Sequence, residues 1–186
     1  MFFDDSNAII VSSGHLNTYI GYATDEVPSY QGLSYYSIFG GQSQYLERLN
    51  INLSRGARLQ PLISNNQIIS ADEYMKFVSH MVSKFNDEIP EHPMLILNKE
   101  APNLISTRKK LAELLFETYH APCTYFGNEA VTGLFSTGSF NGVLIDSGTY
   151  STTISPIYDG CLLKKSNLIR YTKSRYRRRD SYRKND

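Results

Sequence analysis

The chain has few cysteines, no long apolar run and no basic start, and each absence excludes a class of protein. Cys123 and Cys161 share no metal or redox spacing, and one pair cannot form a disulfide scaffold, so we expect reduced thiols in or near a core. No window approaches the ~18 consecutive apolar residues of a membrane-spanning helix. Acids stand at Asp4 and Asp5, where a signal peptide needs bases. The sequence therefore predicts a protein of the nucleus or cytoplasm that does not span a membrane.

The motifs of common metal and hydrolase sites are missing as well. No ligand spacing connects the four histidines, which are His15, His80, His92 and His120. Asp146 and Ser147 lack the Gly-x-Ser-x-Gly turn of a hydrolase nucleophile. The fourteen tyrosines come without the signature of an RNA-binding sheet, which favours a packing role for them. These patterns predict neither a zinc site nor a serine hydrolase.

Charge is distributed unevenly along a chain whose composition is otherwise that of a soluble globular protein. Hydrophobic residues make up 41% and charged residues 20%, which excludes wholesale disorder. Ten Lys and Arg stand against two acids from Lys164 onward, while residues 1–163 hold nine bases and sixteen acids. The segment Lys173–Asp186 has no hydrophobic periodicity, which predicts a disordered basic tail over 171–186. Such a tail binds nucleic acid without sequence preference or an anionic membrane, or acts as a nuclear import signal; the alternative is a solvated end with no specific role.

Strand-like and helix-like segments alternate along the rest of the chain. We expect strands at 8–11, 18–23, 35–38, 94–97, 123–126, 142–146 and 152–156, with the first two and the last two forming hairpins. Ser70 and Glu73 form a capping box that begins one helix, Ser106 or Thr107 caps a second, and Asn128 caps a third. Residues 40–66 are rich in Gly, Gln, Asn and Ser, which indicates a loop-rich insertion or small subdomain.

One short pattern occurs twice, at a constant offset of 134 residues. Each copy, 8–20 and 142–154, has an apolar run, a Ser-Gly turn and a returning segment. The turn residues are Ser12, Ser13, Gly14 and His15 in the first copy, and Asp146, Ser147, Gly148 and Thr149 in the second. Backbone N–H groups converge in such turns into an anion-binding nest, and glycine permits the backbone that this needs. Two such turns that face each other would hold a polyphosphate between them. The alternative is that each is an ordinary hairpin turn that happens to use Ser-Gly.

Several segments, taken in order, resemble actin and the actin-related proteins. They include His92-Pro-Met-Leu-Ile-Leu97, Glu100-Ala-Pro102, Arg108-Lys-Lys-Leu111, Leu115-Phe-Glu-Thr-Tyr119, Ala130-Val131, Val143-Leu-Ile-Asp-Ser-Gly148 and Pro156-Ile-Tyr-Asp-Gly160. The resemblance covers roughly residues 7–170, about the first half of a family member. It implies an α/β fold, the actin-like ATPase (ribonuclease H-like) fold, in which two lobes hold ATP and Mg²⁺ or Ca²⁺ between them.

Against that family pattern, the phosphate turns of this chain have lost charge. The resemblance puts Ser12 where the family has an Asp that helps to organise the metal ion, and Tyr19 where it has a phosphate-contacting Lys. Thr149 and Thr153 replace an acid and a His, and Glu129 stands at the water-positioning Gln. Phosphoryl transfer depends on such charges, so we expect a degenerate phosphate site, no catalytic residue and weak ATP binding, with Asp146 as a weak metal candidate.

The resemblance also divides the chain and indicates a role. It predicts a first lobe over 1–141, with 40–66 a shortened insertion, and the truncated start of a second lobe over 142–170. Apolar strand residues there should be partly exposed, re-paired with the first lobe or covered by a partner, namely Val143, Ile145, Ile154 and Ile157. We expect a non-catalytic assembly subunit that holds a helical segment of a chromatin-remodelling motor. The alternative is a cytoskeletal actin-like protein, of the dynactin type or filament-associated, that binds ATP.

Overall fold

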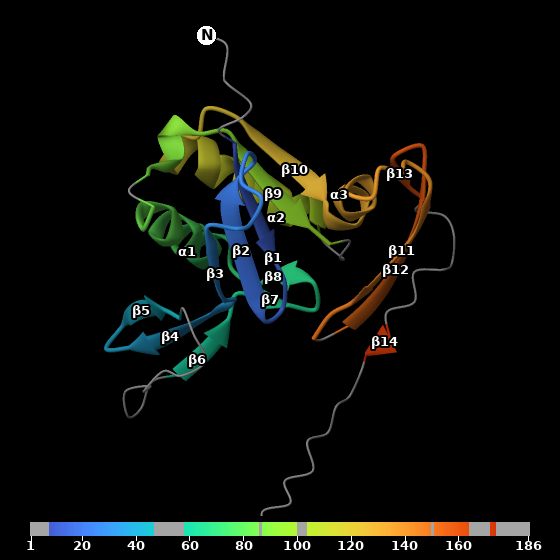
Figure 1. The fold of residues 1–186 in the computed structure, drawn as a ribbon. Coiled ribbons are helices and arrows are strands. Elements are labelled where there is room, and N and C mark those ends of the chain that lie inside the picture. The colour runs from blue at the N-terminus through green and yellow to red at the C-terminus, as the bar shows by residue number, and fades with distance from the viewer. Residues whose placement is uncertain are drawn as a thin grey trace, which may run out of the picture.

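A five-stranded mixed sheet lies at the centre of the fold (Figure 1). The computed structural model describes residues 8–46, 58–85, 87–99, 104–149, 151–163 and 172–173. The sheet has the order β10-β9-β1-β2-β3, built from β1 (Ile9–Ser13), β2 (Asn17–Tyr22), β3 (Tyr30–Leu33), β9 (Met94–Asn98) and β10 (Thr124–Asn128). Strands β1, β9 and β10 run parallel, and β2 and β3 are antiparallel to their neighbours. The predicted first hairpin and the strand after Pro93 are confirmed, while β3 was not predicted.

Helix α1 (Ala71–Ser83) covers the sheet with one apolar face. Ser70 begins it as expected, because the Ser70 hydroxyl accepts a hydrogen bond from the N–H of Glu73 at 3.3 Å. Its fully buried side chains follow helical spacing and meet the apolar residues of β1, β2 and β9; they are Tyr74, Met75, Phe77, Val78 and Met81. This packing fixes the position of β1, which carries the first Ser-Gly turn.

Helix α2 (Leu104–Glu113) packs beside α1 and continues into the π-helical turn η3 (Leu114–Thr118). Its buried face includes Leu111 and Leu115, as the sequence predicts. The predicted cap is wrong, because Ser106 and Thr107 lie inside a helix that already includes Leu104. Hydroxyl residues are tolerated in a first turn as well as at a cap, so the residue type alone did not mark the start. No helix in the described ranges is long and apolar enough to cross a membrane.

Short strands fill much of the stretch that was expected to be loop. Strands β4 (Tyr35–Phe39), β5 (Gln42–Tyr45) and β6 (Arg58–Pro61) form a sheet of order β5-β4-β6, and β7 (Ile63–Ser64) pairs with β8 (Gln67–Ile68). Residues 47–57 lie outside the described ranges. What is described of 40–66 is therefore mainly paired strand, which fits the small-subdomain alternative. A 3-10 turn, η2 (Ile89–Glu91), precedes β9.

The C-terminal elements form a second, smaller sheet (Figure 1). Helix α3 (Glu129–Phe135) follows β10 and lies between it and the hairpin of β11 (Gly142–Ser147) and β12 (Ser151–Tyr158). Asn128 caps α3 as predicted, since its side chain accepts hydrogen bonds from two backbone N–H groups of the helix. Strands β13 (Cys161–Leu162) and β14 (Thr172–Lys173) both pair with β12.

The apolar side chains of this hairpin divide between its two faces. Val143 and Ile145 are 60% and 66% exposed, whereas Ile157 is 3% exposed and Ile154 is half-buried. The expected exposure is therefore confirmed for β11, and Ile157 is covered by the chain itself. The basic tail differs from expectation at two residues, because Thr172 and Lys173 pair with β12; residues 174–186 lie outside the described ranges.

Both cysteines lie at the surface. Cys123 immediately precedes β10 of the central sheet, and Cys161 begins β13 of the smaller sheet. They are free thiols, as expected, but the prediction that they lie in or near a core is wrong. Each stands at the end of a strand, where a small side chain can face solvent without exposing the sheet.

Candidate functional site: two serine-glycine turns and an internal lysine

Two turns of the same geometry close the hairpins β1–β2 and β11–β12. The equivalent backbone bonds are Gly14 N–H to Asn17 O at 2.8 Å and Gly148 N–H to Ser151 O at 3.0 Å, and the equivalent hydroxyl pairs are Thr18 with Ser13 and Thr152 with Ser147, both at 3.2 Å. The repeat in the sequence is thus a repeat in the structure. The predicted anion-binding role stays a prediction, because each glycine N–H is already used within its own turn.

The side chains of the first turn are held by the protein around them. The hydroxyl of Ser13 lies 2.9 Å from that of the fully buried Tyr74. The His15 ring has Nδ1 3.1 Å from the carbonyl oxygen of Ile63 and Nε2 3.2 Å from the hydroxyl of Tyr35. The cavity beside this turn measures about 10 Å³, which is the space of a single water at most. His15 therefore acts here as a structural imidazole.

The larger cavity lies beside the second turn. Its volume is about 270 Å³, and it is bounded by the start of α3 and by the facing strands β11 and β12. Its charged lining residues are Lys99, Glu129 and Asp146. Ser147 and Thr149, which the sequence placed with Asp146, are exposed and do not line it. The cavity therefore brings together only two of the predicted site residues, Asp146 and Glu129.

Lys99 joins these two carboxylates. Its ammonium forms an ion pair with Asp146 on β11 and lies 3.9 Å from Oε2 of Glu129 on α3. Ser12 of the first turn donates a hydrogen bond to Oε1 of Glu129 at 3.4 Å. A Cβ added at Gly148 would meet the Lys99 ammonium at 3.7 Å. The lysine therefore occupies the space between the two turns, and it lines the cavities beside both.

Burial and a neighbouring acid both act on Glu129. Burial raises the pKa of its carboxyl above the ordinary value, and the Asp146 carboxylate raises it further, while the Lys99 ammonium and the Ser12 hydrogen bond lower it. The net effect is a raised pKa for the Glu129 carboxyl. Without the lysine, the two carboxylates would repel each other across the cavity, so the single positive charge stabilises both.

A nucleotide with its divalent cation does not fit this arrangement. A hard cation needs several oxygen ligands, but the Asp146 carboxylate is already paired with an ammonium and Ser12 provides no charge. Strand register places Tyr19 opposite Ser12 and Thr153 opposite Asp146, so the neutral replacements stand directly across from the turn residues. Tyr19 faces a surface depression that also holds Asp25 and Glu26, where the local charge is negative. The cavity beside Ser13, Gly14 and His15 measures about 10 Å³, which is too small for a phosphate.

Comparison with known proteins agrees with the fold. Residues 3–170 match the family model described as Actin. The chain belongs to the actin family. Actin-related protein 4 of Candida albicans is 28% identical over 174 residues, covering 90% of this chain and 36% of that protein. The protein of the same name from Schizosaccharomyces pombe is 26% identical over 170 residues, covering 90% and 39%.

A shorter stretch is more similar. Actin-related protein 4 of Arabidopsis thaliana is 43% identical over 77 residues, which are 41% of this chain and 17% of that protein. The chain therefore spans less than two fifths of the length of the curated relatives it matches. The fold of this actin-family chain accordingly corresponds to a first lobe, with a five-stranded mixed sheet at its centre.

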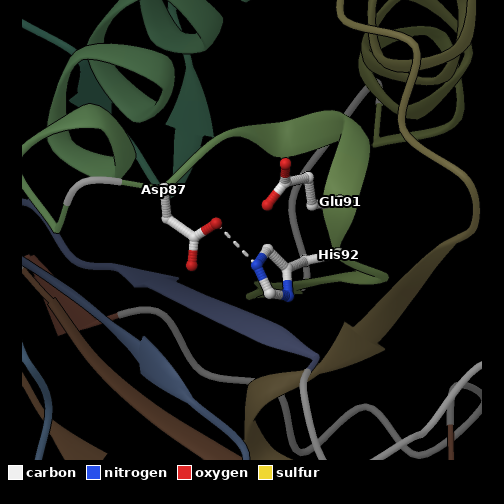
Figure 2. Close-up of side chains that lie close together, drawn as sticks. All are labelled: Asp87, Glu91 and His92. Atoms are coloured by element: carbon white, nitrogen blue, oxygen red, sulfur yellow. Dashed lines mark hydrogen bonds and ion pairs between the residues drawn. The ribbon is translucent and has the colours of Figure 1, made fainter.

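A second cluster of polar side chains lies away from the turns, near η2 (Figure 2). The ligand atoms of Asp87, Glu91 and His92 all lie within 4.8 Å of one another. His92 Nε2 is 2.7 Å from Oδ1 of Asp87, and the Tyr22 hydroxyl donates to the other oxygen. These hydrogen bonds hold the pKa of Asp87 below its usual range, although burial acts in the opposite direction. Asp87 is therefore already hydrogen-bonded to both Tyr22 and His92.

Sequence reasoning missed both Lys99 and this second cluster. Lys99 was passed over because it stands between segments that resemble the family, and nothing local shows that it reaches Asp146, 47 positions away. His92 has no zinc-ligand spacing to another histidine, and its partner is Asp87, five positions before it. The available signal was a lone basic residue at the carboxyl end of a buried parallel strand, where ligands of α/β sheets gather.

Proposed function

We propose that this chain is a non-catalytic actin-related protein that acts as a structural subunit of a larger assembly. One observation carries the proposal: the two carboxylates of the cavity, Asp146 and Glu129, are paired internally with Lys99. The positions that would supply further charge hold Ser12, Tyr19 and Thr153. Phosphoryl transfer needs positioned charges that stabilise the transition state, so an active ATPase site is not supported.

The assembly that we favour is a chromatin-remodelling complex in the nucleus, with a helical segment of its motor subunit as the partner. The relatives named Actin-related protein 4 support a subunit of the actin-related type. The surface that we assign to the partner is the outer face of β11, where Val143 and Ile145 are exposed. Apolar groups that are clustered on a strand face favour burial against another protein.

The alternative is a cytoskeletal actin-like protein of the cytoplasm that binds ATP. It is favoured by the cavity of about 270 Å³ next to the retained Asp146-Ser147-Gly148 turn. This alternative requires Lys99 to leave Asp146 when nucleotide binds, so that the carboxylate becomes available to a cation.

Binding of a labelled helical motor segment, measured by fluorescence anisotropy with and without Mg-ATP, tests the proposal. We expect the same affinity in both conditions and a large loss in Ile145→Asp. Ile105→Asp is the matched control, because Ile105 is 86% exposed on α2, away from the hairpin. Binding that requires ATP would support the cytoskeletal alternative, and equal loss in both variants would show that the hairpin face is not the contact.

A further inference from the structure

We propose that Lys99 is a built-in cation that clamps the β11–β12 hairpin onto the central sheet and keeps divalent metal ions out of the cavity between them. The inference does not depend on the proposed function, because it concerns the isolated chain without nucleotide or partner. It assigns a positioning role to a residue that lies in neither Ser-Gly turn.

The lysine connects elements that the backbone does not connect. Lys99 directly follows β9, an inner strand of the central sheet, and its ammonium pairs with Asp146 on β11. The same ammonium lies near Glu129 at the start of α3, and Glu129 accepts a hydrogen bond from Ser12 on β1. One side chain therefore ties two parallel strands of the large sheet to the first strand of the small one.

Among the described residues, packing against α3 and one side-chain hydrogen bond also join the hairpin to the rest of the chain. Leu134 and Gly133 of α3 pack against Gly142 and Leu144 of β11, and the Ser151 hydroxyl donates to Asn66 at 3.3 Å. The opposite face of β11 is exposed. A two-stranded hairpin is only marginally stable by itself, so the ionic contact at its turn end adds to the attachment that the packing against α3 provides.

The lysine is also well placed to exclude a cation. Its side chain is 18% exposed, and its ammonium stands between the two carboxylates that line the cavity. When the lysine is removed, the Asp146 and Glu129 carboxylates and the Ser12 hydroxyl remain as oxygen ligands. Carboxylate and hydroxyl oxygens suit Mg²⁺, Ca²⁺ and Mn²⁺, and the mutual repulsion of the two acids favours binding of a divalent ion.

Amide hydrogen exchange of the full chain tests the clamp. In Lys99→Gln we expect the amides of β11 and β12 to exchange about three- to tenfold faster, the effect of losing a partly exposed ion pair. Lys99→Arg should restore slow exchange. Lys110→Gln is the matched control, because Lys110 pairs with Glu113 on the surface of α2. In this variant the β11–β12 hairpin should exchange its amides as in the wild type. Unchanged hairpin exchange in Lys99→Gln would overturn the proposal.

Two further measurements keep the test decisive. The amides of β9 serve as an internal reference, since they should stay protected in every variant. If Lys99→Gln does not fold, Asp146→Asn removes the other partner of the same ion pair. It should increase the amide exchange rates of the hairpin to the same extent. Unchanged hairpin exchange in Asp146→Asn would overturn the clamp equally. The double variant should exchange no faster than either single one, because both remove a single contact.

Titration with Mn²⁺, followed by its electron paramagnetic resonance signal, tests the exclusion. We expect Lys99→Gln to bind one Mn²⁺ at least tenfold more tightly than the wild type. This gain should disappear in the double variant Lys99→Gln/Asp146→Asn. Equal Mn²⁺ affinity in the wild type and in Lys99→Gln would show that the lysine excludes nothing and would overturn this part of the proposal.

Discussion

Replacement of Asp87 by asparagine should destabilise the central sheet, because one carboxylate there holds three donors. Asp87 accepts hydrogen bonds from the Tyr22 hydroxyl of β2, from His92 at 2.7 Å and from the N–H of Glu88 at 2.9 Å. Its side chain is 15% exposed and that of His92 is 10% exposed. Asparagine keeps the size of the side chain but loses the charge and one acceptor oxygen.

The magnitude follows from these contacts. A hydrogen bond to a charged group contributes about 1.5–3 kcal/mol and a neutral one about 0.5–1.5 kcal/mol, and a buried donor without a partner carries an additional cost. Asp87→Asn weakens two such bonds and removes one, so we expect a loss of about 2–3 kcal/mol. For a domain of this size that corresponds to a fall in Tm on the order of 5–10 °C.

The effect should also depend on pH. The fold lowers the pKa of Asp87, so its stabilising contribution is complete above the carboxyl's pKa in the unfolded chain and is lost as pH falls through the lower, folded pKa. The Asp87→Asn variant lacks this pH-dependent contribution, because asparagine does not ionise. The difference in stability between wild type and Asp87→Asn should therefore be large at pH 7 and shrink toward pH 3.

Urea unfolding at pH 7 and at pH 3 measures both effects, with Glu117→Gln as the control. Glu117 is an exposed acid on η3, and its replacement should change the free energy of unfolding by less than about 0.5 kcal/mol. An Asp87→Asn protein as stable as the wild type at pH 7, or an equal loss at both pH values, would refute the reasoning.

The remaining predictions concern the cavity, the tail and the hairpin. Calorimetry with Mg-ATP should show weak or no binding and no hydrolysis, and micromolar affinity, about 8 kcal/mol, would contradict this. Deletion of Lys173–Asp186 should abolish any nucleic-acid binding that falls steeply with salt, and binding that survives would place the site in the body of the chain. In urea unfolding Ile157→Ala should cost about 2–4 kcal/mol and the exposed Ile145→Ala almost nothing, so equal costs would contradict the burial. Glu129→Gln should not lower the free energy of unfolding at pH 7. Burial disfavours the charged carboxylate, so the contribution of Glu129 to stability declines as the pH rises through its raised pKa. A clear loss of stability in this variant would contradict that direction.

The sequence predicts what depends on local patterns. The capping box of Ser70 and Glu73, the buried face of α1 and the cap at Asn128 were all found, because each needs only residues a few positions apart. The repeated turn was found by comparing two segments, and it reappears down to equal hydroxyl distances. Nothing more than spacing and residue type was needed for these elements.

What the sequence could not predict depends on contacts between distant segments. The pairing of Lys99 with Asp146 needs both the parallel sheet and the position of the small hairpin. The exposure of Cys123 depends on where β10 begins, and residue type favoured the opposite answer. The predicted residues Asp146 and Glu129 thus line one cavity together with Lys99, which was not predicted.

The two free thiols make this chain easy to measure. Cys123 stands on the central sheet and Cys161 on the small one, and the sequence has no other cysteine. Nitroxide or fluorophore labels on both residues would report the separation of the two sheets in the wild-type sequence, without any engineered position. The two cysteines of the sequence thus allow a distance measurement across the junction where Lys99 lies.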